Sequence, residues 1–360
     1  MATKSSLTLS SATFAKLSPQ PYLLANLQPQ DPNTPPSRTN GRQPEQTRPV
    51  AINTSSLTHA HGSAVVRTGD TTVICGVRGE TITALQIPNY RASISNTGAL
   101  TTTNELRDYD LLVPNIELAT GSAPDFLPGV PPTSLAQTLS TRIYSLLHTS
   151  SVLDVEDLRI YHQRSHEGGA GGSDDGDDGD EAMQDVDEQD EDLPAREVKA
   201  YWVLYIDILF ISFDGNPFDA AWAAVLAALR DTKLPRAYWD ADREMVLCSR
   251  RGAPVPLTVS GLPVAYTAAV FTAREGLKQS QNQKRGGDKG QFWTLADPDR
   301  FEESLCDEMM TVIVDRSGGK GNETKLLGIS KSGGTIVGPE AIRKLVKAAE
   351  DRWLELKAVL

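Results

Sequence analysis

The stretch that decides the fold is YWVLYIDILFISFDGNPFDAAWAAVLAAL, which spans Tyr201–Leu229. Its first part, Tyr201–Phe213, is an almost unbroken apolar and β-branched run, and such a run predicts a strand buried on both faces. A turn at Asp214-Gly215-Asn216 follows, and Pro217 stands where the first residue of a helix belongs. The apolar residues after Pro217 recur at helical spacing. The chain is therefore expected to pass from a strand through a tight turn into a helix with one apolar face.

This turn has the architecture of an anion site without the chemistry of one. Free backbone N–H groups at the start of a helix can bind phosphate where a glycine turn exposes them. Pro217 has no N–H to donate, and Asp214 and Asp219 place negative charge where a phosphate would lie. The sequence thus argues against phosphate binding at this turn.

The acidic balance of the chain comes from one segment. The chain has 360 residues and a formal net charge of −12, and thirteen of its acids lie in residues 166–192, which hold no Lys or Arg. The rest carries 35 bases against 34 acids, so an RNA partner is not excluded. Three widely separated cysteines without a CxxC pattern predict a reduced intracellular protein. With no secretory pattern at its start and no apolar run of ~20 residues, we expect a soluble protein of the cytoplasm or nucleus without membrane contact.

The composition divides the chain into a short arm and one domain. Residues 1–30 are weakly amphipathic and predict an N-terminal arm of one or two short helices. Residues 31–360 are expected to form a single domain, interrupted by a disordered acidic insert at 165–195 and a polar loop at 274–290. Strands followed by a helix occur in each half, which favours an α/β (α+β layered) fold with two similar βα layers. Predicted strands lie at Val50–Leu57, Gly62–Thr68, Thr71–Val77, Tyr109–Ala119, Gly261–Thr272 and Met309–Asp315, and predicted helices begin after Pro132 and at Gly338.

One cluster of carboxylates lies in an otherwise structured segment. Such a cluster can hold Mg²⁺ through oxygen ligands or act in general acid–base chemistry. The pattern favours instead a solvated helical turn opening after Pro298, because acids are stabilised at a helix N-terminus. The cluster consists of Asp297, Asp299, Glu302, Glu303 and Asp307.

Other candidate sites are weaker. The glycines of Ser317–Gly321 do not have Walker spacing and predict a hairpin turn. His59 and His61 show no paired-ligand pattern, so we expect no metal and no cofactor. The polar loop could contact RNA phosphates or remain a solvated loop. Its basic residues are Arg274, Lys278, Lys284, Arg285 and Lys289.

The succession of motifs along the chain resembles the RNase PH-type ring subunits of the eukaryotic RNA exosome. The Gly69–Val77 block is the most specific of these motifs. The resemblance covers about residues 35–358, apart from the two insertions. The motifs are Asn40-Gly41-Arg42, His61-Gly62-Ser63-Ala64, Gly69-Asp70-Thr71-Thr72-Val73-Ile74-Cys75-Gly76-Val77, Val113-Pro114-Asn115 and Asp214-Gly215-Asn216. Trp202–Tyr205, Ala227–Leu229 and Leu234-Pro235 narrow the resemblance to one type of ring subunit.

The resemblance implies an RNase PH-like fold (ribosomal protein S5 domain 2-like) of two pseudo-symmetric βα layers. It also implies a six-membered ring with other RNase PH-like subunits, capped by S1/KH subunits, through which RNA is threaded to an associated hydrolytic nuclease. A place in the nucleus, nucleolus and cytoplasm is expected with it. A third possibility is an RNA-binding module that acts through Arg42, Arg67, Arg78 and the basic loop, so these residues are the candidates for RNA contact.

The resemblance further implies that the chain is not an enzyme. Phosphorolytic relatives hold phosphate with Gly-Gly-Thr-Arg before the central helix, and Asn216, Pro217 and Phe218 stand at the last three of these positions. Without the Arg there is no bidentate phosphate clamp. The resemblance matches Asp297 to the first family acid and places Glu303 near the second, and both are interpreted as vestigial. The alternative is a phosphate- and Mg²⁺-dependent 3′–5′ exoribonuclease whose site is shared with a neighbouring subunit that supplies the arginines.

Overall fold

The computed structural model describes residues 10–29, 33–88, 90, 102–129, 131–162, 197–272, 292–306, 308–318, 323–333 and 338–360. The predicted acidic insert at 165–195 and polar loop at 274–290, with its five basic residues, lie outside the described residues. Asp307 of the carboxylate cluster does so as well. The expectations for these segments stay predictions.

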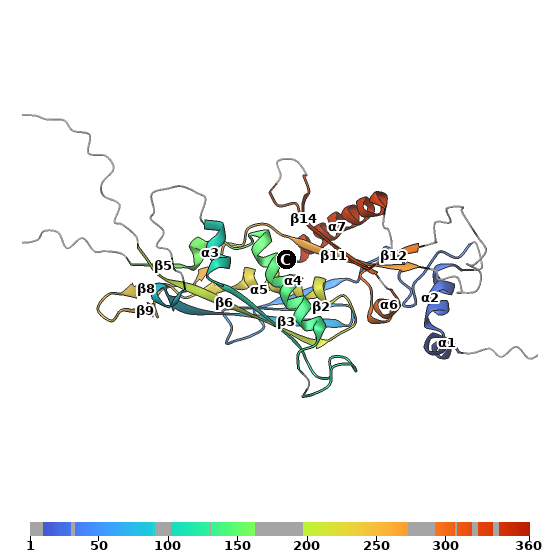
Figure 1. Ribbon diagram of the computed structural model, residues 1–360, viewed down its shortest axis with the longest axis horizontal. Helices are drawn as coiled ribbons and strands as arrows, with labels where there is room; N and C mark the ends of the chain where they lie inside the picture. Colours follow the sequence, from blue (N-terminus) through green and yellow to red (C-terminus); the bar gives the residue numbers. More distant parts are fainter. Residues whose placement is uncertain are drawn as a thin grey trace, which may run out of the picture.

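The first half of the chain builds a six-stranded sheet (Figure 1). Its order is β1-β2-β3-β6-β4, with β5 paired to the start of β6. All pairs are antiparallel except β4 with β6. Gly69, at φ 58°, forms the β2–β3 turn, and Pro114 is tolerated because β4 is an edge strand. The strands are β1 (Val50–Thr54), β2 (Gly62–Thr68), β3 (Thr71–Thr83), β4 (Leu112–Leu118), β5 (Arg159–His162) and β6 (Glu197–Ser212).

The second half builds a four-stranded antiparallel sheet in the order β12-β11-β13-β14. Of these strands, the sequence predicts β11 and β13 and misses the other two. Two short pairs, β7 with β10 and β8 with β9, lie between the halves of the chain. The strands are β7 (Lys233–Leu234), β8 (Ala237–Asp240), β9 (Met245–Cys248), β10 (Val255–Pro256), β11 (Val264–Thr272), β12 (Phe292–Ala296), β13 (Glu308–Asp315) and β14 (Lys325–Ser332).

Three long helices pack on these sheets. The central helix α5 contacts β2 and β3 of the first sheet and β11 of the second, α7 packs on β11 and β13, and α4 packs on β4. No described helix is long and apolar enough to cross a membrane. The layered α/β prediction is therefore confirmed. The helices are α1 (Ser11–Leu17), α2 (Pro19–Leu27), α3 (Thr102–Asp108), α4 (Ser134–Ser150), α5 (Pro217–Asp231), α6 (Arg300–Leu305) and α7 (Pro339–Val359), with 3₁₀ turns at Ala84–Gln86 and Val155–Leu158.

The N-terminal arm forms the two predicted helices. The second, α2, buries Leu23 and Leu27 in a small apolar cluster with Phe271 of β11 and Leu295 of β12. This cluster is separate from the main core. The arm is thus attached to the outer end of the second sheet.

Two expectations from the central stretch need correction. Helix α5 has no single apolar face, since every residue of Ala221–Leu229 is buried. Its many alanines let both sheets approach it closely. Strand β6 is not buried on both faces along its whole length, because Asp207 and Ile211 are exposed. In that part of β6 only the face toward α5 lies in the core.

Candidate functional site

The turn from β6 into α5 is closed by protein groups. Gly215 (φ 75°) and Asn216 (φ 47°) both have left-handed backbones, and Pro217 opens the helix. A Cβ on Gly215 would lie 2.5 Å from the carbonyl carbon of Asp299, so the turn packs directly on the start of α6. The Asn216 N–H, which could otherwise face an anion, donates to Oε1 of Glu303 at 2.7 Å. The Asn216 amide is therefore not available to phosphate, and Pro217 has no N–H to offer.

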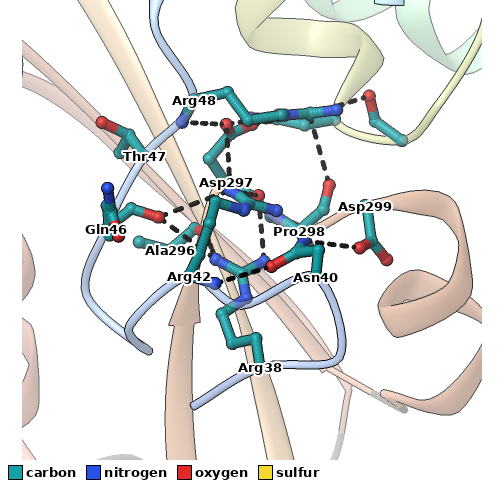
Figure 2. A network of polar contacts seen from close by, with 12 residues as sticks. Arg38, Asn40, Arg42, Gln46, Thr47, Arg48, Ala296, Asp297, Pro298 and Asp299 are labelled. Atoms are coloured by element: carbon teal, nitrogen blue, oxygen red, sulfur yellow. Dashed lines mark hydrogen bonds and ion pairs between the residues drawn. The ribbon is translucent and has the colours of Figure 1, made fainter. Parts of the chain in front are cut away.

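An arginine from the segment before β1 occupies the space beside this turn (Figure 2). Arg48 donates from Nε to Oδ2 and from Nη2 to Oδ1 of Asp297, each at 2.8 Å. Its Nη1 donates to the carbonyl of Asp214 at 2.7 Å. Burial alone would raise the pKa of Asp297, but the hydrogen bonds and charge of Arg48 outweigh burial and hold this pKa below its usual range. Asp297 is thus an ionised partner of a buried arginine.

Two further arginines of the same segment reach the carboxylate cluster. Arg38 forms a fully buried ion pair with Glu302 and donates to the carbonyl of Ala296 at 2.5 Å. Arg42 donates to the carbonyl of Asp297 at 3.1 Å and lies 3.6 Å from its carboxylate. Arg38, Arg42 and Arg48 together are called the arginine clasp below. The clasp ties the chain before the first sheet to the β12–α6 turn of the second.

The interpretation of the cluster as a solvated helical turn is therefore half wrong. A helix does open after Pro298, and Asp299 and Glu302 form its capping box. However, Asp297, Asp299 and Glu302 are all buried. Buried carboxylates require ionic partners or hydrogen bonds, and the clasp supplies them.

Asn216 orders the inside of the turn. Its Nδ2 donates to Asp297 at 2.7 Å and to Asp219 at 2.9 Å, which fixes the orientation of the amide. Asp219 also accepts from the N–H and hydroxyl of Thr267 at 2.8 and 2.7 Å, and burial raises its pKa. A cavity of about 20 Å³ borders these groups. This volume is enough for about one water molecule and too small for phosphate.

Phe218 stands where active relatives are expected to carry the phosphate-binding arginine. Its ring is buried, and the guanidinium of Arg142 from α4 lies 3.9 Å from the ring centre. Arg142 also donates from Nη2 to the hydroxyl of Thr311 at 2.9 Å. A cation is therefore present near the turn, but it stacks on the aromatic ring and joins α4 to α5 and β13.

Comparison of the sequence with known proteins shows the family of this chain. Residues 46–235, about half of the chain, match the RNase PH profile, described as domain 1 of the 3′ exoribonuclease family. The chain belongs to the RNase PH family. The exosome complex component Rrp43 of Schizosaccharomyces pombe is 28% identical over 96% of this chain and 97% of its own length. The archaeal exosome component Rrp42 of Methanopyrus kandleri is 26% identical over 78% of this chain and 77% of its own length.

Solved structures confirm the RNase PH fold. A chain of the Archaeoglobus fulgidus exosome, solved with RNA bound to the active site, superposes with a TM-score of 0.60. It is 23% identical and the match covers 94% of this chain and 96% of that one. A second archaeal exosome core matches with a TM-score of 0.55, at 22% identity and with 94% and 96% coverage. At sequence identities of 23% and 22%, this structural similarity shows only that the fold is shared.

The arginines of this RNase PH chain that were predicted to bind RNA differ in how far their side chains are exposed to solvent. The side chains of Arg67 and Arg78 are 66% and 57% exposed on the first sheet, and Arg78 also lies over the ring of Tyr205. Arg42 is only 13% exposed and points into the clasp. His61 accepts the N–H of Gly79 through Nδ1, and no group of His, Cys, Asp or Glu among the described residues is arranged to hold a metal. The RNA roles stay predictions, with Arg67 and Arg78 the better placed.

Sequence reasoning did not find Arg38, Arg48 or Arg142. The first two lie in the Pro-rich segment before β1, which has no apolar periodicity to indicate a buried role. A usable signal existed, because three arginines in 38–48 and an excess of acids in 297–303 have complementary charge. Arg142 gave no such signal, since it is a single basic residue beside the apolar face of α4.

Glu303 provides a pH-dependent test of this site. Burial raises its pKa from 4.5 to about 7, and the acceptance of the Asn216 N–H offsets burial only in part. A carboxyl whose pKa is raised by folding stabilises the fold below pH ~4.5 and loses this contribution as the pH rises toward 7. After allowance for partial exposure, Glu303→Gln is expected to raise the free energy of unfolding at pH 8 by about 2 kcal/mol and to leave it unchanged near pH 4.5.

Urea titrations at the two pH values measure this difference. The exposed Glu117 gives a control, since Glu117→Gln should change stability little at either pH. An equal effect of Glu303→Gln at both pH values would show that Glu303 does not titrate in this range.

Proposed function

We propose that this chain is a structural, non-catalytic subunit of an RNA exosome core ring. In this role it packs between other RNase PH-like subunits beneath S1/KH cap subunits. It thereby helps to form the channel that delivers RNA to an associated hydrolytic nuclease for 3′–5′ processing, rRNA maturation and turnover. By its sequence motifs, the ring position is that of the subunit called exosome component eight in animals. Work in the nucleus, nucleolus and cytoplasm follows from this proposal.

The observation that carries the proposal is the filled phosphate turn. The turn amide of Asn216 is bonded to Glu303, and Phe218 is buried in place of a guanidinium. The nearby carboxylates of Asp214 and Asp219 repel an anion. Removing one charged donor from such a site costs on the order of 2–4 kcal/mol of transition-state stabilisation, and here several donors are missing together. The fold is kept while the groups that would grip phosphate are gone.

Surface chemistry supports packing in a ring. Ile211 on the open face of the first sheet and Leu326 and Ile329 on the edge strand β14 are exposed apolar residues. Such residues, and an unpaired strand edge, are typical of surfaces that are covered by other subunits. The relatives from Schizosaccharomyces pombe and from archaea are themselves exosome components.

The alternative, a Mg²⁺-dependent enzyme with a shared site, finds little support in the donor set. Both carboxylate oxygens of Asp297 already accept from Arg48, and Oδ1 also accepts from Asn216. Asp297 is therefore occupied by protein groups, and Oε1 of Glu303, the other acid of this alternative, accepts the Asn216 N–H. A neighbour would have to supply both the arginines and the metal ligands.

Two measurements test the proposal. Affinity purification of the full-length chain from its own cells is expected to recover other RNase PH-like subunits in equal amounts. The purified chain, incubated with RNA, phosphate and Mg²⁺, is expected to release no nucleoside diphosphates, while an active RNase PH enzyme does so under the same conditions. Recovery of a lone monomer would contradict the ring role, and release of nucleoside diphosphates would contradict the non-catalytic role.

A further inference from the structure

An exposed basic surface lies at the base of the β8–β9 hairpin, away from the clasp. Figure 1 shows this hairpin at the end of the molecule opposite to α1 and α2. Four cationic residues are exposed there on two neighbouring segments. They are Lys233, Arg236, Arg250 and Arg251, called the hairpin basic surface below.

The sheet pairing brings these residues together. Lys233 and Leu234 form β7, which pairs with β10, so residues 233 and 256 lie side by side. Just before β8 and just after β9, the carbonyl of Arg236 accepts the N–H of Ser249 at 2.8 Å, which joins the two segments. A Cβ on Gly252 would lie 3.3 Å from Cδ of Arg236, so the Arg236 side chain lies over the loop that carries Arg250 and Arg251. The four charges therefore belong to one surface.

The positive charge of this surface is only partly offset by the described acids. None of the four residues makes an ion pair with a described acid, and the segments 232–239 and 245–257 contain no Asp or Glu. The nearest acid along the chain is Asp231, two residues before Lys233, and the two charges attract one another. The three arginines lie further from it, and the next acids are Asp240, Asp242 and Glu244 at the hairpin tip. Asp231 is held by the Ser55 hydroxyl and the Ser63 N–H. Such an unpaired surface attracts a polyanion.

An aromatic ring stands beside these charges. Tyr238 follows Arg236 by two residues, so both side chains lie on the same face of the strand. Tyr238 is 49% exposed, and its cross-strand partner is Leu247. Exposed aromatic rings among arginines are typical of single-stranded nucleic-acid sites, in which bases stack on the ring and cations contact the phosphates.

We infer that the hairpin basic surface with Tyr238 binds single-stranded RNA. The arginines contact successive phosphates, and the Tyr238 ring stacks on a base without selecting its identity. This inference rests on the proposed role in an RNA-handling ring and adds an RNA contact at the end of the subunit. An acidic protein would also satisfy the charges, but it would not need the exposed ring.

The test measures binding of a fluorescent 20-nucleotide oligouridylate to the full-length chain by anisotropy across a salt series. The triple variant Arg236→Gln, Arg250→Gln, Arg251→Gln is expected to weaken RNA binding near 0.1 M salt at least about tenfold. The plot of log association constant against log salt concentration should also become less steep, its negative slope shrinking in magnitude by about 2. The control variant Arg343→Gln, Lys344→Gln, Lys347→Gln removes three exposed charges from α7 and should change little.

Tyr238 separates RNA from a general polyanion. Tyr238→Ala is expected to weaken oligouridylate binding about tenfold and heparin binding little, while Tyr238→Phe keeps the affinity for RNA.

In the assembled complex, ultraviolet cross-linking followed by mass spectrometry should find RNA attached at Tyr238. The inference is wrong if both triple variants weaken RNA binding equally, or if Tyr238→Ala leaves it intact. Copurification of ring subunits does not depend on either result, so the proposed function is judged separately.

Discussion

Asp297→Ala is expected to lower the free energy of unfolding of the full-length chain by about 3–5 kcal/mol, because it leaves the buried Arg48 without its carboxylate partner. Arg48 donates twice to Asp297 at 2.8 Å, and Asn216 loses an acceptor as well. Asp297 also has a left-handed backbone at φ 45°, which alanine tolerates less well than aspartate. Urea denaturation at pH 7 measures the loss. The pair is fully ionised at that pH, because Arg48 holds the pKa of Asp297 below its usual range.

A control variant and a double-mutant cycle separate the contributions to this loss. Asp125→Ala removes the same side chain from an exposed ion pair with Arg300, in which Asp125 is 73% exposed, and should cost less than about 1 kcal/mol. Asp297→Asn keeps a residue that accepts the left-handed backbone and removes only the charge. Combined with Arg48→Met, it should be less destabilising than the sum of the single changes, with a coupling of about 1–3 kcal/mol. An Asp297→Ala loss as small as that of Asp125→Ala would mean that the clasp is solvated.

The same result limits what Asp297 can reveal about catalysis. An Asp297→Ala subunit that reduces the activity of an assembled complex does so by damaging the fold, whether or not the residue ever met a substrate. Glu303→Gln is the cleaner probe of the shared-site alternative, since it is expected to stabilise the subunit at neutral pH while removing a carboxylate. Unchanged activity of a complex with that variant supports the non-catalytic role.

The central strand, turn and helix were predictable because their signals are local. A long apolar run, a turn with Gly215 and Pro217 at the helix start all lie within one short segment, and the structure places β6 and α5 there. The edge strands β12 and β14 were missed because they carry little of this signal. Strand β14, for example, has mostly exposed residues, so it shows no apolar run or alternation.

The chemistry of the turn was only half predictable. That Pro217 and Phe218 offer phosphate no side-chain donor could be read directly from the sequence. That Arg48 fills the adjacent space could not, because its partner Asp297 lies 249 residues away and a single sequence contains no measure of which segments meet. For the same reason the acids looked solvated, although Glu302 is fully buried against Arg38.

Gly62→Ala is expected to destabilise the fold by at least about 3 kcal/mol, because strand β2 and the end of α5 touch at this residue. A Cβ there would lie 2.2 Å from Oγ1 and 2.5 Å from Cα of Thr232, and 2.6 Å from the carbonyl oxygen of Ala228. Two of these atoms are backbone and cannot rotate away. Thr232 and Ala228 are themselves fully buried, so α5 cannot retreat without opening the core between the sheets. The requirement for glycine comes from close packing, since Gly62 does not have a left-handed backbone.

Thermal and urea unfolding of the full-length chain measure this effect, with Gly318→Ala as the matched control. A Cβ on Gly318 meets no atom within 4 Å, so the control should change stability by no more than about 0.5 kcal/mol. Because α5 contacts β11 as well as β2, Gly62→Ala should also loosen the second sheet and increase amide hydrogen exchange along β11. If Gly62→Ala were as mild as Gly318→Ala, β2 and α5 would have to lie further apart, and the close two-layer packing described for this fold would be wrong.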